Sequence, residues 1–570
     1  MSLFARCMIL STALVAQLGL AAERAGRDVP ADEPAFLVVA PDRGFLGDEE
    51  IRDAFEAFAT TRKAALVFVT DERTTESLNA GVRSLAEEGA RRIVVLPFFL
   101  SRSDPRYVRV AALLSDASAW NAAVEWARPF GESYFAVEAL ADRLRAVQEP
   151  ETTRVIVVGA GARDEDSRRG MLVDWERLAT AASAGLGFES VRAAVETSAE
   201  RLASALEEAA RGTQRALIVP FHLGSKLDGM MSYTASVKQA APPGAHVLEG
   251  DVTPDASVTA WMAREANRRV PLRAADVGVV ALAHGSDYHW NETMRQAVAP
   301  LAQRYKVEPA FSMADPIVIE RAVRRLEARG ARFIVILRVF GLASSFRGSV
   351  ERLIGLDVER GDAPDPHAGH AMSHGHGAMR PPARIRTAAV MATVGGLEDD
   401  PLFAEALLAR AQALSRDPAR ETVILVAHGD GDDAQDAHWR AMLASLARRM
   451  RALGGDRFRA VRTATWREDW PDKRKPAVEE VRAFVQEATA DGGRALVVPA
   501  RTLGQGPERR LLEGLPFELG EGFAPLPLFT RWAEGEVAAA VAEEAALRNR
   551  TAAGGIPEGP PPASRAAAAR

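Results

Sequence analysis

The sequence predicts an α/β protein made of tandem, parallel, four-stranded repeats, with helices on both faces of each sheet. Apolar runs of strand length, such as AFLVVAP from Ala35 and RRIVVLPFFL from Arg91, recur through the chain. Amphipathic helical stretches separate these runs, and the same order of elements returns four times. Because the runs are apolar on both faces, they are typical of parallel strands that helices cover on each side.

Each repeat contains two very apolar strands and a later glycine turn. The first strands begin near Ala35, Thr153, Asp276 and Thr422, and the third strands begin near Arg91, Arg215, Arg332 and Arg494. We therefore expect four repeats, at residues 35–150, 151–272, 273–420 and 421–550. Residues 551–570 are rich in Ala, Pro and Gly, and we expect a disordered tail there.

The composition excludes several classes of protein. With 570 residues, 47% hydrophobic and 26% charged, the chain has the composition of a soluble globular protein of several domains. Its net charge of -6 gives no indication of a nucleic-acid partner. Cys7 is the only cysteine, which excludes a disulfide framework and a thiolate metal site. Any protein ligands of a metal must then be His, carboxylate or Met.

The N-terminus has the pattern of an export signal. Arg6 precedes an apolar stretch from Cys7 to Leu20, and small residues follow at Ala21 and Ala22. This pattern predicts a signal peptide at residues 1–22 and an exported, periplasmic protein with no stable membrane span after signal removal. The alternatives are an uncleaved N-terminal anchor and a buried first helix in a cytoplasmic protein.

Two histidines follow first strands directly. His284 ends the run VGVVALA within Val277 to Asn291, and His428 ends the run VILVA that begins at Val423. Ligands of parallel α/β sheets bind at the carboxyl ends of the strands, so both histidines are candidates for chemistry. The alternative is that each is a hydrogen-bonded structural residue.

An insertion in the third repeat, residues 362–382, reads DAPDPHAGHAMSHGHGAMRPP and is expected to be a flexible surface loop. Its histidines, which we expect to bind nickel, cobalt, copper or zinc, are His367, His370, His374 and His376. The insertion joins the third helix to the fourth strand, so it should lie at the sheet edge opposite His284. We therefore expect a metal store or delivery arm; a chance spacer is the alternative.

Segments of the first and third repeats resemble a known family. The third repeat contains ALAHGSDYHWNETM from Ala281 and AFSMADPIVIERAVRRLEARGARFIVILRVF from Ala310, and the first contains SLAEEGARRIVVLPFFL and RPFGESYFAVEALADRL. These segments resemble class II tetrapyrrole chelatases of the sirohydrochlorin cobaltochelatase or ferrochelatase type (CbiX-like). The resemblance implies chelatase-like repeats that pair into lobed units, repeats one with two and three with four.

In that family, the first-strand His and a second His after the third strand bind the metal, and an acidic residue after the second strand assists. The resemblance thus implies that His284 and His428 act as metal ligands or proton acceptors. The sequence departs from the family at the other positions. The second His position holds Phe346 in the third repeat and Pro507 in the fourth. The acidic position holds Met313 and Trp466, although Asp315, Glu468 and Asp469 lie close by in the sequence. The first two repeats have Ala40-Pro41 and Ala160-Gly161 in place of the His-Gly turn, and we interpret these repeats as degenerate.

Substitute ligands are present near both His-Gly turns. His289 and His438 lie shortly after His284 and His428, and each precedes a tryptophan, Trp290 or Trp439, that is able to stack on a tetrapyrrole. The alternative is that both histidines cap or solvate helix starts. His222 in the second repeat is expected to be structural.

Three functions remain open. The leading hypothesis is a chelatase-like protein that inserts or binds a divalent metal (cobalt, nickel, iron or zinc) in a tetrapyrrole between repeats three and four. The alternatives are a non-catalytic, exported metal or haem carrier on the same fold and a structural repeat protein without ligands.

Overall fold

The computed structural model describes residues 33–70, 73–114, 122–224, 233–253, 255–360 and 380–553. The predicted signal peptide and all four histidines of the insertion lie outside the described residues.

The first two repeats, here called units 1 and 2, alternate strands and helices as predicted. Unit 1 contains β1 (Ala35–Pro41), α2 (Gly44–Ala59), β2 (Ala64–Val69), α3 (Thr74–Glu87), β3 (Arg92–Pro97), α4 (Pro105–Leu114), β4 (Ala123–Trp126) and α5 (Tyr134–Arg145). Unit 2 contains β5 (Thr153–Ala160), α6 (Glu165–Ser183), β6 (Ser190–Glu196), α7 (Ala199–Ala210), β7 (Arg215–Pro220), α8 (Tyr233–Ala240), β8 (His246–Val247) and α9 (Ala256–Asn267).

Units 3 and 4 follow the same order. Unit 3 contains β9 (Val277–Ala283), α10 (Tyr288–Val298), β10 (Lys306–Phe311), α11 (Pro316–Ala328), β11 (Phe333–Val339), α12 (Arg347–Leu353), α13 (Leu356–Arg360), β12 (Val390–Gly395) and α14 (Pro401–Leu414). Unit 4 contains β13 (Glu421–Ala427), α15 (Asp433–Ala452), β14 (Ala460–Thr465), α16 (Pro471–Thr489), β15 (Arg494–Pro499), α17 (Glu508–Leu511), β16 (Glu518–Leu519) and α18 (Pro527–Ala553). Helix α18 thus continues past the predicted tail boundary at residue 550.

Each unit has one parallel, four-stranded sheet, which confirms the predicted fold class. The strand order places the second, first, third and fourth strands side by side, as in β10-β9-β11-β12. Alternate residues of β9 enter different cores: Val279 and Ala281 pack on one face, and Val280 and Leu282 on the other. The sheet is therefore covered on both faces.

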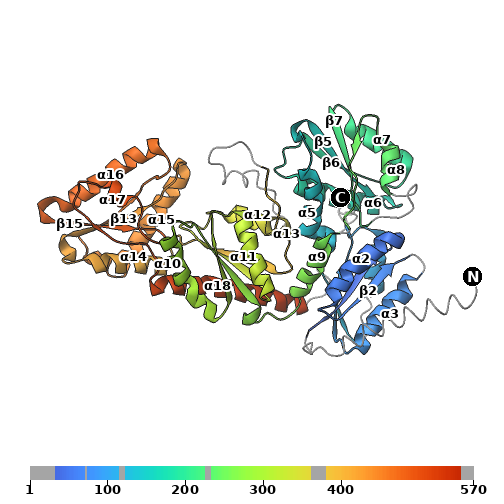
Figure 1. Cartoon of the computed structure of the whole chain (residues 1–570), viewed down its shortest axis with the longest axis horizontal. Coiled ribbons are helices and arrows are strands. Elements are labelled where there is room, and N and C mark those ends of the chain that lie inside the picture. Colours follow the sequence, from blue (N-terminus) through green and yellow to red (C-terminus); the bar gives the residue numbers. More distant parts are fainter. Residues whose placement is uncertain are drawn as a thin grey trace, which may run out of the picture.

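Neighbouring units exchange their last helices. Helix α5 leaves unit 1 and packs against α6 of unit 2, while α9 returns to pack against α2 of unit 1. In the same way α14 packs against α15 of unit 4, and α18 packs under β11 and β12 of unit 3. One core extends through units 1 and 2 and another through units 3 and 4. We call these the first pair and the second pair (Figure 1).

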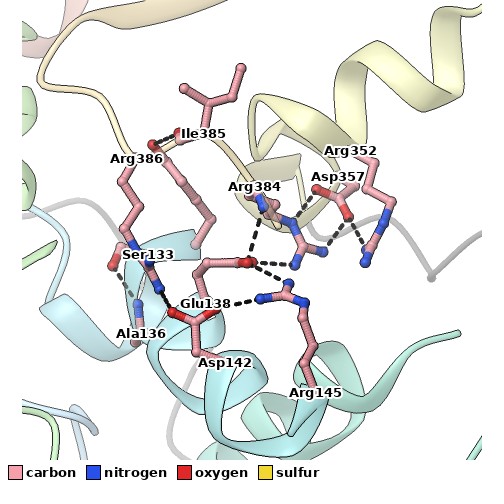
Figure 2. A network of polar contacts seen from close by, with 11 residues as sticks. Ser133, Ala136, Glu138, Asp142, Arg145, Arg352, Asp357, Arg384, Ile385 and Arg386 are labelled. Carbon is pink, nitrogen blue, oxygen red and sulfur yellow. Dashed lines mark hydrogen bonds and ion pairs between the residues drawn. The ribbon is translucent and has the colours of Figure 1, made fainter. Parts of the chain in front are cut away.

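A buried ionic network joins the first pair to unit 3 (Figure 2). Glu138 on α5 is fully buried; it accepts from the backbone N of Arg384 at 3.0 Å and from its Nη1 at 3.2 Å, and it also pairs with Arg145. Nη2 of Arg384 in turn lies 2.7 Å from Oδ2 of Asp357. Because Asp357 and Arg384 flank the His-rich insertion, the described ends of that insertion fix unit 3 to the first pair.

No helix in the described part of the chain has the length and apolarity of a membrane span.

A second ion cluster at this junction, around Glu359, should make the free energy of unfolding depend on pH. Glu359 lies 2.9 Å from Nη2 of Arg264 and 2.7 Å from Nη2 of Arg268. Burial disfavours the charged carboxylate, but the two guanidinium groups outweigh burial and lower the pKa of Glu359 to about 2. A carboxyl pKa below the unfolded value of about 4.3 stabilises the fold above that pH, and this contribution is lost as the pH falls towards 2.

We predict that the free energy of unfolding falls on acidification from pH 5 to pH 2 in both proteins. The fall should be larger in wild type than in Glu359→Gln, by up to about 3 kcal/mol. Urea unfolding at several pH values measures this difference. The control is Glu320→Gln, in an exposed pair with Arg324, which should retain the wild-type pH dependence. Parallel pH curves for wild type and Glu359→Gln would contradict the assignment.

Candidate functional site

The carboxyl edge of unit 3 presents His284, and exposed apolar residues follow the same two strand ends. Ala283 at the end of β9 is paired with Phe311 at the end of β10, so the segments after both strands leave the sheet side by side. The exposed His284 ring has Nδ1 2.6 Å from the Gly285 carbonyl oxygen. Three large apolar side chains beyond these strand ends are exposed, at 71% for Tyr288, 44% for Met313 and 77% for Ile317.

The matching edge of unit 4 is polar. His428 lies with Nδ1 2.8 Å from the Gly429 carbonyl oxygen and Nε2 3.1 Å from Oδ2 of Asp469. Trp470 meets the imidazole edge to face, with ring centroids 5.9 Å apart. Both ring nitrogens of His428 thus face oxygen acceptors, and Asp469 follows the second strand, where the sequence placed a nearby acid. The carboxylate fixes the ring orientation.

The turn that presents His428 requires glycine. Gly429 has a φ of 76°, and a Cβ there would lie 2.7 Å from Oδ1 of Asp436 and 2.8 Å from Cβ of Thr465. Oδ2 of Asp436 accepts from Nε of Arg440 at 3.0 Å. Hydrogen bonding to Glu480 raises the pKa of Arg440, with Asp436 adding to the effect against burial. The turn therefore packs against a chain of ion pairs formed by Asp436, Arg440 and Glu480.

Sequence reasoning missed Arg501. Strand pairing sets Pro499 beside Val426 and Pro220 beside Val158, so Arg501 in unit 4 occupies the position of His222 in unit 2. Arg501 forms an ion pair with Glu468. The sequence indicated a role for His222 but not for the equivalent position in unit 4, which strand pairing identifies as Arg501.

Trp466, Phe346 and Asp315, which lie at or near the positions expected for the acid and the second histidine, have structural roles. Trp466 is fully buried and its Nε1 donates to Oε1 of Glu508 at 3.2 Å. Phe346 has a φ of 55° and its ring lies 4.9 Å from that of Phe340. Asp315 caps α11 by accepting from the backbone N of Ile317 and Val318.

The contacts of the substitute histidines are with residues other than the strand-end histidines. His289 is exposed and its ring lies 5.6 Å from that of Tyr288. His438 on α15 has Nε2 3.3 Å from Oε2 of Glu398, which belongs to unit 3. His438 therefore bridges the two units. Within the described ranges no group of three or more His, Cys, Asp or Glu residues is arranged to hold a metal.

The two tryptophans help to hold the second pair together. Trp439 is 9% exposed within the core shared by units 3 and 4, and its ring covers Gly341, which follows β11. Trp290 is half-buried against the same core and lies beside Gly504, which follows β15. Each ring thus contacts the partner unit. This packing removes Trp439 from the residues that we propose to contact a macrocycle.

The corresponding edge of the first pair has no strand-end histidines. Pro41 and Ala160 stand where His284 and His428 stand in the second pair. His222 is 6% exposed, with Nε2 2.8 Å from Oδ1 of Asp251 and Nδ1 3.1 Å from the Gly224 carbonyl oxygen. These contacts agree with the structural role expected for His222.

The fold and its edges define a tandem, parallel α/β protein with strand-end histidines in one of two pairs. The CbiX family model matches residues 47–147, which confirms the predicted resemblance to CbiX-like class II chelatases. The matched stretch lies within unit 1 and begins after Pro41. It therefore includes neither of the strand-end histidines, His284 and His428. No curated protein sequence matches the chain.

Three solved structures are similar to the chain. SirB from Bacillus subtilis with Fe3+ is 18% identical, with a TM-score of 0.30, over 40% of this chain and 91% of that chain. A multi-domain protein from Deinococcus radiodurans with structural similarity to chelatases is 18% identical, with a TM-score of 0.29, over 46% and 55%. A sugar ABC transport substrate-binding protein from Bordetella parapertussis is 14% identical, with a TM-score of 0.22, over 54% and 83%. Likeness at this level carries no argument about ligands.

The packing of Trp439 predicts a large stability effect without any ligand. Trp439→Ala removes a buried ring from the shared core and should cost roughly 3–5 kcal/mol of unfolding free energy. Trp290→Ala, at a half-buried position, should cost less. Denaturant unfolding of the ligand-free protein measures both losses. An equal, small effect of the two substitutions would show that Trp439 does not hold the units together.

Proposed function

We propose that the second pair binds a divalent metal and a tetrapyrrole, and inserts the metal into the macrocycle. The observation that carries this proposal is the ion pair between His428 and Asp469 at the ligand edge of unit 4. Cobalt, nickel, iron and zinc all suit imidazole ligands of this kind. We also propose that the mature protein acts after export, as its N-terminal sequence predicts.

The two edges of the second pair suit different parts of such a substrate. Tyr288, Met313 and Ile317 around His284 offer apolar surface to the plane of a macrocycle. Arg501 and Asp469 in unit 4 offer charge to its polar periphery and to the metal. This division supports docking on unit 3 and proton transfer on unit 4.

The chemistry assigned to the histidines follows from the protons that the metal displaces. A pyrrole nitrogen must lose its proton before it coordinates a divalent metal. We assign the acceptance of that proton to the pair of His428 and Asp469, whose hydrogen bond at Nε2 of His428 must open to receive it. His284, which is exposed and has no carboxylate at its Nε2 among the described residues, is the better candidate for a weak, exchangeable metal ligand.

A non-catalytic metal or haem carrier is the second candidate. It is favoured by the lack, among the described residues, of a cluster of three or more metal-ligating side chains. A carrier would bind metal or macrocycle stoichiometrically without accelerating metal insertion.

Removal of the strand-end histidines should separate these functions. With cobalt and sirohydrochlorin, we predict that His428→Ala lowers the insertion rate roughly 100-fold and Asp469→Asn at least tenfold, because proton transfer is lost or misoriented. His284→Ala should raise the metal concentration needed for half-maximal rate. The absorbance change of the macrocycle measures each rate.

The matched control is His246→Ala, which removes an exposed histidine of the first pair and should leave the rate unchanged. Insertion above the spontaneous rate that survives both His284→Ala and His428→Ala would contradict the site. Stoichiometric binding without insertion in wild type would favour the carrier.

The insertion should contribute metal capacity alone. Replacing His367, His370, His374 and His376 by Ser leaves the ionic ends of the insertion intact, and we predict fewer bound metal ions by equilibrium dialysis. Turnover at saturating metal should be unchanged. A loss of turnover at saturating metal would contradict a storage or delivery role.

A further inference from the structure

The outer edge of the unit 1 sheet is a strand edge with no neighbouring strand in the described part of the chain. Strand β2 is the first in the order β2-β1-β3-β4 and lies between α2 and α3 (Figure 1). The carbonyl oxygens of Lys63 and Val69 accept hydrogen bonds from backbone N–H groups near the two ends of β1. Because backbone groups alternate in direction along a strand, those of Ala64, Leu66 and Phe68 point away from β1. No side chain among the described residues donates to these three carbonyl oxygens.

The edge strands of the other three units are covered. In each of them an arginine donates to an outward carbonyl oxygen of the edge strand. These contacts join Arg168 to Val195 in β6 at 3.4 Å, Arg329 to Val307 in β10 at 3.2 Å, and Arg451 to Val461 in β14 at 2.9 Å. Strand β10 also has Pro309, which lacks an N–H, at the register position that Leu66 occupies in β2. An arginine across an edge and a proline within it both hinder the addition of a further strand, and among the described residues β2 has neither.

Unit 1 has a carboxylate where unit 3 has its covering arginine. Glu88 and Arg329 each follow the helix between the second and third strands, and Gly-Ala-Arg follows both. Strand pairing likewise sets Ala64 of β2 at the position of Val307 in β10. Glu88 is exposed and its carboxylate forms no ion pair with the described residues; Lys63 donates from Nζ to the Glu88 carbonyl oxygen at 3.4 Å. Glu88 therefore leaves the Ala64 carbonyl oxygen uncovered and offers negative charge to a basic partner.

The open edge is the floor of a groove of about 910 Å³. One wall is α2, which contributes Phe55. The other wall is α3, whose lining residues are small: Ser77, Ala80, Gly81 and Ser84. The groove at the edge of β6 in unit 2 has about 460 Å³ and is lined by the covering Arg168. An edge strand set between two helices admits a single extended segment, whereas another sheet edge would bring helices of its own into the groove.

The two ends of the groove differ in charge. Glu88 lines it at the end where β2 begins, beside Ala64. Arg52 lines it at the other end, with its guanidinium carbon 5.9 Å from the centre of the Phe68 ring. Arg52 also forms an exposed ion pair with Glu49 at 3.5 Å, which leaves it open to a second carboxylate. A complementary segment has a basic residue at the Ala64 end and an acidic residue at the Phe68 end.

We propose that the β2 edge of unit 1 is a docking site for an extended peptide segment of another protein, which adds a strand to the sheet. Its backbone pairs with the outward groups of Ala64, Leu66 and Phe68, and its side chains alternate between the α2 and α3 walls. A Lys or Arg of the segment meets Glu88 and the Ala64 carbonyl oxygen, and so takes the place that Arg329 fills within unit 3. The site is independent of the proposed function, since it lies in the first pair.

The test selects random heptapeptides, displayed on phage, on the full-length protein and measures the selected peptides by fluorescence anisotropy. We expect sequences with apolar residues at alternate positions, a Lys or Arg at one end and an Asp or Glu at the other. Replacing the basic residue of a selected peptide by Gln should weaken binding roughly tenfold, because a hydrogen bond from a charged group is lost.

Two substitutions should close the edge. Leu66→Pro removes an outward N–H and copies Pro309, which occupies the same register position in unit 3. Glu88→Arg copies Arg329 at an exposed position and should cover the Ala64 carbonyl oxygen. Each should weaken the selected peptides roughly tenfold or more and leave the far-UV circular dichroism unchanged.

The matched control is Glu87→Arg, which makes the same change of charge at an exposed neighbour outside the groove and should keep the affinity within about twofold. No enriched peptide, or selected peptides that bind Leu66→Pro and Glu88→Arg as tightly as wild type, would overturn the docking site. Enrichment of sequences found in residues 1–32 would assign the edge to this chain's own N-terminal segment. Self-association of wild type that Leu66→Pro abolishes would assign it to a second copy, and either outcome would overturn a separate partner.

Discussion

The structure depends on the exchange of the last helix between neighbouring units. Each sheet has one face that its partner's terminal helix covers, as α18 covers β11 and β12 while α14 crosses to unit 4. Apolar burial contributes about 25 cal/mol per Å² of surface removed from water, so a single unit would forgo much of its core. The pair is therefore the folding unit, and the exchange brings the first helix of each unit against the loop after its partner's third strand.

The same architecture gives the two pairs different edges. In the first pair, Arg43 of unit 1 reaches across to His222 and Gly224 of unit 2. In the second pair, the strand-end positions carry His284 and His428, which remain accessible. The strand-end register position thus carries His284 and His428 in the second pair and Pro41 and Ala160 in the first, while each pair keeps a shared core.

The sequence predicted the four parallel sheets and the placement of His284 and His428 at strand ends. Both predictions rest on apolar runs of strand length and on the residues that directly follow them, which are visible in short stretches of sequence. It did not predict that Trp439 is covered by the partner unit or that His438 reaches Glu398, since both contacts cross between units. Arg501 was missed because its ion pair with Glu468 joins segments that follow different strands, and its equivalence to His222 becomes visible only in the strand pairing. The contact between His428 and Asp469 required the backbone path after β14.

The central claim is that metal binds at the strand-end histidines of the second pair. Its most direct test is imidazole NMR of the full chain, with the four insertion histidines replaced by Ser, during titration with cobalt. The account predicts that paramagnetic effects appear first at His284 and His428 and leave the buried His222 unaffected. Effects at His222 alone, or at no histidine of the described residues, would contradict it.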